Sequence, residues 1–160
     1  MTQENKKKCA EMVGMANVYK SSSEVMNIGN ILLKLLGKKQ NIIVNDHPLN
    51  FDSVILPRIV LLAIDIEILL KAICLADNDN KPMGHNWVDL YNSLPESRKQ
   101  EIIDSMPSEF QNDFMQYLDN NKDSFIKWRY AYENNGLTCD WSFIHELANV
   151  LGSIALKIVK

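Results

Sequence analysis

The sequence of 160 residues is poor in cysteine, histidine, glycine and proline, and these shortages exclude several classes of protein. Its three cysteines are widely spaced and form no CxxC pair, which argues against a disulfide framework and a zinc site. No phosphate-cradling glycine-rich loop, GxSxG elbow or HExxH motif is present. We therefore expect reduced cysteines, no bound metal and no cofactor. The scattered residues are Cys9, Cys74, Cys139, His47, His85 and His145.

The chain also lacks a net positive charge, because its net charge is −3 and its isoelectric point is near 5.6. Such a surface does not grip nucleic acid by charge alone, so any RNA contact must be local and lie in a cleft. We expect no signal peptide, because no apolar stretch follows the first lysines. Charged residues interrupt the apolar run at 59–76, so we expect no membrane contact and a cytoplasmic location.

The stretch from Leu56 to Ala76 is long and almost entirely apolar, which predicts a buried central helix. Its charges fall on two sides of the helix, because successive residues are about 100° apart. Arg58 and Asp65 share one side. Glu67 and Lys71 share the other, in the favoured order for a pair four residues apart. That second side either faces solvent or lines a polar cleft between helices.

Helical periodicity continues along the chain, and no strand pattern is convincing. We predict an all-α fold, an antiparallel bundle of about five to six helices in a single domain over residues 1–160. Residues 6–37 form one bent helix or two, and residues 38–54 form a connection. In that connection, IIV is a short extended piece and His47-Pro48 a turn. Further helices are expected near 87–94, at 96–105, and from an Asp140 cap to the C-terminus. The aromatic stripe at 109–134 favours one long helix, with a break at Asn120–Ser124 as the alternative.

Three pieces of the sequence carry a resemblance. Ile-Glu-Ile-Leu-Leu-Lys, with Glu67 and Lys71, comes first, then Gly84-His85, then Arg129-Tyr130 before a late apolar helix. In this order they resemble the HEPN family, small helical-bundle domains of prokaryotic and viral defence, toxin–antitoxin and RNA-processing systems. The resemblance covers roughly residues 55–160. It implies a HEPN-like bundle that forms a homodimer, binds RNA or a nucleotide, and meets an antitoxin-type protein partner.

Catalytic members of that family cut RNA without a metal, using an Arg-x4–6-His motif. The arginine stabilises phosphate charge and the histidine moves a proton. A Glu-x3-Lys pair on an earlier helix supports the site. Carried over to this chain, the resemblance makes Arg129 the motif arginine and Glu67 and Lys71 the supporting pair.

The chain departs from the motif at its histidine. The positions four to six residues after Arg129 are Glu133, Asn134 and Asn135. Asparagine can hydrogen-bond a phosphate or ribose, but it cannot carry a proton near neutral pH. The motif is therefore degenerate, although the ingredients of a phosphate or base site remain. The residues expected to contact such a ligand are Glu67, Lys71, His85, Arg129, Tyr130, Glu133 and Asn134.

Three hypotheses about function follow. The first is a HEPN-like module of a defence or toxin–antitoxin system that binds RNA or a nucleotide phosphate in a cleft between helices. The second is a metal-independent endoribonuclease, in which Arg129 acts with His85 or His145 as the replacement base. The third is a non-catalytic protein-interaction module, whose dimer or partner surface is a ridge of small residues: Ala148, Gly152 and Ala155.

Overall fold

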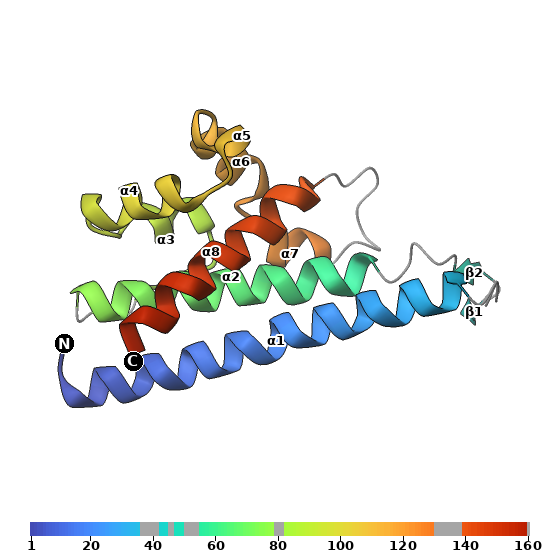
Figure 1. Ribbon diagram of the computed structural model, residues 1–160, viewed down its shortest axis with the longest axis horizontal. Coiled ribbons are helices and arrows are strands. Elements are labelled where there is room, and N and C mark those ends of the chain that lie inside the picture. Colours follow the sequence, from blue (N-terminus) through green and yellow to red (C-terminus); the bar gives the residue numbers. More distant parts are fainter. Residues whose placement is uncertain (36–41, 45–46, 50–54, 79–81, 130–138, 160) are drawn as a thin grey trace.

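The computed structural model describes residues 1–35, 42–44, 47–49, 55–78, 82–129 and 139–159, and most of them are helical (Figure 1). The predicted all-α bundle is confirmed. The described part of the chain has eight helices rather than five or six, because several are short. They are α1 (Gln3–Leu35), α2 (Ile55–Asn78), α3 (Trp87–Asn92), α4 (Glu96–Ser105), α5 (Ser108–Gln111), α6 (Phe114–Asn121), α7 (Ser124–Arg129) and α8 (Trp141–Val159).

The two longest helices form the base of the fold. α1 and α2 run antiparallel along the long axis of the molecule, and α8 crosses over α2 (Figure 1). Both termini lie at the same end of the α1–α2 pair. The register between the two helices is fixed near that end, where the Cys9 thiol donates to the Ala72 carbonyl at 3.3 Å.

α1 is a single continuous helix, which settles the question of one helix or two. Its buried side chains recur every three, four or seven residues, at Cys9, Val13, Ala16 and Ser23. An isolated helix gains little stability from propensity alone, so burial of this face against α2 is what holds α1 in place.

The core lies mainly between α2 and α8. The predicted small-residue ridge is on the buried side of α8, and a Cβ atom added at Gly152 would lie 4.0 Å from Leu69 Cδ1. The ridge therefore packs inside the chain, and its assignment as a partner surface was wrong. By length and composition α8 could cross a membrane, yet half of that segment is buried inside the structure.

The single long helix predicted at 109–134 is wrong. The described part of that segment is divided into α5, α6 and α7, with interruptions at Asn112–Asp113 and Lys122–Asp123. Tertiary contacts cause the second interruption, because the Lys122 carbonyl accepts a hydrogen bond from the Trp87 backbone N–H at 3.1 Å. The predicted aromatic stripe is largely in the core, with Phe110, Phe114 and Tyr117 packed around Phe143.

A short hairpin joins α1 to α2. Strand β1 (Ile42–Val44) confirms the extended piece IIV and pairs with β2 (His47–Leu49) in antiparallel register. His47-Pro48 was predicted as a turn, but His47 pairs with Val44 and Pro48 with Ile43. Pairing with β1, whose residues are all β-branched, outweighs the preference of the His-Pro sequence for a turn.

Candidate functional site

The Glu67 carboxylate contacts two other residues that were predicted to line the site, Lys71 and His85. Glu67 Oε1 accepts a hydrogen bond from Lys71 Nζ at 2.7 Å, one turn further along α2. His85 Nδ1 lies 2.9 Å from both Glu67 Oε1 and Oε2, although it is 18 residues away in sequence. We call Glu67, Lys71 and His85 the carboxylate triad. His85 follows α2 in the chain, and in the triad it lies beside Glu67 of that helix.

Two side chains of the triad, Glu67 and Lys71, are largely buried, and the third, His85, is partly exposed. Exposed fractions of the side chains are 10% for Glu67, 12% for Lys71 and 54% for His85. Glu67 and Lys71 therefore do not lie on a solvent-facing side of α2, and both line a pocket between helices. A buried carboxylate is expensive without partners, and here two donors compensate for its burial.

The backbone on both sides of His85 fixes the imidazole. Gly84 has φ of 95°, a left-handed conformation that residues with a Cβ rarely adopt. Asn86 caps α3 by accepting hydrogen bonds from the N–H groups of Val88 and Asp89. Trp87 is fully buried. The left-handed turn at Gly84 and the capped helix after it thus direct His85 to Glu67.

The first turn of α7 lies beside the triad. The rings of His85 and Phe125 are 5.9 Å apart, and α7 contacts α2. Arg129 is the last residue of α7, four residues after Phe125, so its backbone lies one helical turn further on. The Arg129 side chain and the predicted ligand residues Tyr130, Glu133 and Asn134 fall outside the described residues.

His145, the other candidate base, lies elsewhere. Its Nδ1 is 3.3 Å from Glu146 Oε1 and 3.4 Å from the Asn149 side-chain nitrogen, both on its own helix α8. Its ring also lies near Trp141. The structure therefore brings His85 into the predicted site and gives His145 a separate environment.

The opposite side of α2 carries the other predicted pair. The Arg58 guanidinium lies 4.5 Å from the centre of the Trp141 ring, in a cation–π arrangement. Asp65 is completely buried, and neither carboxylate oxygen has a hydrogen-bond partner among the residues that the structure describes. Burial raises the pKa of Asp65 to about 7; Lys20 of α1 counteracts this rise and Glu24 adds to it. Asp65 thus lies in an environment that favours its protonated form.

α1 forms the far wall of the cleft, a feature that no sequence motif indicated. A pocket of about 330 Å³ opens between α1 and α2, and Glu67 and Lys71 line one side of it. Only the antiparallel register of the two helices brings the first turns of α1 to this place. The residues that α1 contributes to the pocket are Lys8, Glu11, Met12 and Met15.

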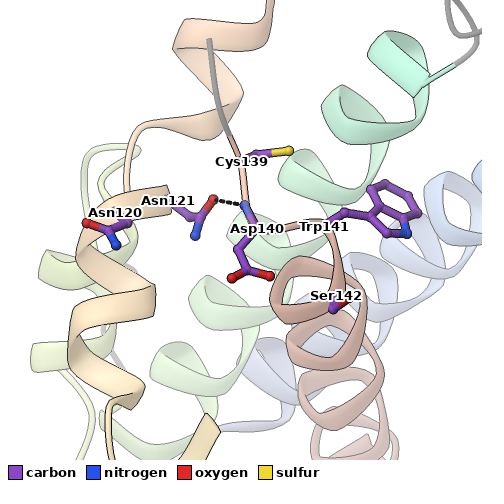
Figure 2. A pocket seen from close by; sticks show the side chains of 6 residues that line it. All are labelled: Asn120, Asn121, Cys139, Asp140, Trp141 and Ser142. Carbon is purple, nitrogen blue, oxygen red and sulfur yellow. Dashed lines mark hydrogen bonds between the residues drawn. The ribbon is translucent and has the colours of Figure 1, made fainter. Parts of the chain in front are cut away.

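A second, larger pocket of about 620 Å³ lies at the start of α8 (Figure 2). The side-chain amide oxygen of Asn121 accepts a hydrogen bond from the Asp140 backbone N–H at 3.3 Å, and the Asp140 carboxylate accepts one from the Phe143 N–H at 3.2 Å. Asp140 is thus the predicted cap of the last helix. Asn121 is buried with both ends of its amide bonded, so these polar groups stabilise the junction of α6 and α8.

The cysteines lie apart from the triad. Cys9 and Cys74 are buried, as expected, and burial raises the pKa of the Cys74 thiol. A thiol in that state is a poor nucleophile. In the parts of the chain that the structure describes, no three histidine, cysteine or acidic residues lie close enough together to hold a metal ion.

Comparisons of the chain with protein-family models, with curated proteins and with solved structures give no match.

Proposed function

We propose that the chain is a HEPN-like helical module that binds the phosphate of RNA or of a nucleotide at the carboxylate triad. The observation that carries the proposal is the convergence of Lys71 and His85 on the Glu67 carboxylate, at 2.7 and 2.9 Å. Both donors approach the same oxygen, so Lys71 Nζ and His85 Nδ1 lie no more than about 5.6 Å apart. The two side chains are therefore close enough to contact one phosphate together.

The triad retains the donors that such a ligand needs. An ammonium group has three N–H donors, and Glu67 uses one of those on Lys71. Glu67 engages Nδ1 of His85, and among the described residues nothing hydrogen-bonds Nε2. With 54% of its side chain exposed, His85 can present Nε2 to a ligand. Glu67 is then a positioning residue, and Lys71 and His85 contact the phosphate.

Arg129 supplies the second charge in this proposal. It ends α7, the helix whose Phe125 ring lies beside His85. A guanidinium can hold a phosphate through two parallel hydrogen bonds, which a single ammonium cannot do. We expect Arg129→Ala to weaken binding without unfolding the bundle.

Fluorescence anisotropy of a labelled oligoribonucleotide, and calorimetric titration of nucleotides, test the proposal. We expect Lys71→Gln, His85→Ala and Arg129→Ala each to weaken binding roughly tenfold or more, as loss of a charge-assisted hydrogen bond predicts. Lys99→Gln is the matched control for Lys71→Gln, because Lys99 pairs with Glu96 at 2.7 Å and has a similarly low side-chain exposure of 18%. Equal affinity of all variants and the parent would refute the proposal.

A second function has its own support, metal-independent cleavage of RNA. A carboxylate that engages Nδ1 fixes the tautomer of an imidazole and leaves Nε2 to take or give a proton. The Glu67–His85 contact has this arrangement, at 2.9 Å. His85 would replace the histidine that the degenerate motif lacks, and Arg129 would stabilise the developing charge on phosphate.

RNA cleavage in the presence of EDTA separates the two functions. If His85 is the base, His85→Ala abolishes cleavage, whereas His145→Ala leaves it intact. His145 is a good control because its Nδ1 also faces a glutamate and its side chain is 40% exposed. Absence of cleavage by the parent, together with phosphate binding, would leave the binding module as the function.

The proposal includes pairing of two copies, so that two triads serve one ligand. The mass of the protein in solution, measured by light scattering, should then be twice the 18.3 kDa of one chain.

A further inference from the structure

The pocket between α1 and α2 extends the carboxylate triad away from His85. It has a volume of about 330 Å³, at the lower end of the range of roughly 300–1,000 Å³ that small-molecule sites occupy. Glu67 and Lys71 belong to both the triad and the pocket. A ligand whose anionic group contacts Lys71 therefore has room for a second group between the helices.

The inner surface of the pocket is apolar. Met12 and Met15 of α1 and Ile68 of α2 line it, and Met15 is 56% exposed. Together these three side chains give the pocket an apolar surface that a ligand can cover. Methionine side chains adapt to flat rings and make favourable sulfur–aromatic contacts.

The rim carries both signs of charge. Lys8 and Glu11 lie on α1, and Lys71 and Glu67 face them from α2. A purely aliphatic ligand would cover part of this rim without offering a partner to the charges of Lys8 and Glu11. An aromatic heterocycle with donors and acceptors around its edge fits both the apolar interior and the mixed rim.

We infer that this pocket binds a nucleobase, and that its sugar-phosphate is held at the carboxylate triad. This inference rests on the proposed phosphate-binding function and adds to it that the base is recognised by α1. The site should therefore prefer a nucleotide unit to a phosphate or a sugar phosphate. Met15 stacks against the ring, and Lys8 and Glu11 contact its polar edge.

Calorimetric titration with inorganic phosphate, ribose 5-phosphate and adenosine 5′-monophosphate tests the inference. The parent should bind the nucleotide at least about tenfold more tightly than ribose 5-phosphate. Met15→Ala should weaken binding of the nucleotide roughly three- to tenfold, without affecting ribose 5-phosphate. Val18→Ala is the matched control, because Val18 is 63% exposed on the next turn of α1 and does not line this pocket.

A short oligoribonucleotide and an abasic backbone of equal length repeat the comparison for RNA. If ribose 5-phosphate and the nucleotide bind equally, RNA and the abasic backbone bind equally, and Lys71→Gln weakens all of them, the phosphate site stands and the base pocket is refuted. If the parent binds none of these probes, the proposed function itself fails, and the base pocket fails with it.

Discussion

Asp65 and Glu67 are two buried carboxylates on the same helix, only two residues apart, and their surroundings are opposite. Glu67 accepts hydrogen bonds from Lys71 and faces His85, at 2.7 and 2.9 Å. Asp65 is fully buried between packed helices, and in the described part of the chain neither of its oxygens has a hydrogen-bond partner. Burial alone therefore does not define the state of an acid; its partners do.

The two buried carboxylates differ in whether a ligand can reach their partners. The partners of Glu67 remain partly accessible, so a ligand can compete for them. Asp65 has no accessible hydrogen-bond partner among the described residues, and burial raises its pKa to about 7. The proposed binding therefore involves the Glu67 side of α2. The Asp65 side is expected to affect stability in a way that depends on pH.

The largest expected effect is that of Asp65→Asn on stability. The folded-state pKa of Asp65 is above its unfolded value, so the folded chain binds more protons between about pH 4 and 7. The free energy of unfolding of the parent should fall as pH rises through that window, by at most about 4 kcal/mol. Asparagine is neutral at every pH, so the variant should lose this dependence and be the more stable protein at pH 8.

Urea unfolding at pH 4.5, 6 and 8 measures this effect. Lys20 and Glu24 of α1 are the charged groups that act on Asp65, so Glu24→Gln serves as a control with a smaller shift. A parent whose unfolding free energy does not fall between pH 4.5 and 8 would contradict the assignment.

Glu67→Gln should change stability in the opposite direction. The variant keeps the shape of the side chain but removes the charge that Lys71 and His85 face. We expect the free energy of unfolding at pH 8 to fall by about 2 kcal/mol, since partners of a largely buried charge lose their compensation. The same urea titration measures it. If Asp65→Asn and Glu67→Gln changed the free energy of unfolding in the same direction, the two sides of α2 would not differ as expected.

A double-mutant cycle sharpens the contrast further. Glu67→Gln and Lys71→Gln, alone and together, should give a coupling energy of about 1.5 kcal/mol. The corresponding cycle on Glu96 and Lys99 is the control, because Glu96 is 89% exposed and exposed pairs couple by less than about 1 kcal/mol. Coupling energies that do not differ between the two cycles would mean that the triad is an ordinary surface pair.

Helical phase on a single element could be predicted from the sequence. The position of Asp65 on one side of α2 and of Glu67 and Lys71 on the other followed from 100° per residue, and the structure confirms it. Helical phase did not identify His85. That residue was selected because it follows a glycine and because of the family resemblance. Its contact with Glu67 spans 18 residues and depends on how the loop returns, which no local period encodes.

Contacts between elements could not be predicted in this way. The aromatic stripe at 109–134 has one helical phase, yet the Lys122 carbonyl bonds Trp87 instead of continuing the helix. The wall of the pocket from Lys8 to Met15 depends on the register of α1 against α2, which the packing at Cys9 and Ala72 sets. Such features arise from tertiary packing, which outweighs local pattern and propensity.

The smallest expected effect concerns the turn that delivers His85 to Glu67. Gly84 has φ of 95°, and alanine there should cost about 1 kcal/mol of unfolding free energy, because a Cβ strains a left-handed residue. Gly14→Ala is the matched control. Gly14 lies in α1 with open space where its Cβ would be, so alanine should stabilise that helix by about 0.5–1 kcal/mol. Gly84→Ala should also weaken phosphate binding, because it displaces His85, whereas Gly14→Ala should not. If Gly84→Ala lowers stability but leaves binding intact, the turn supports the fold alone, and the position of His85 depends on Glu67 rather than on Gly84.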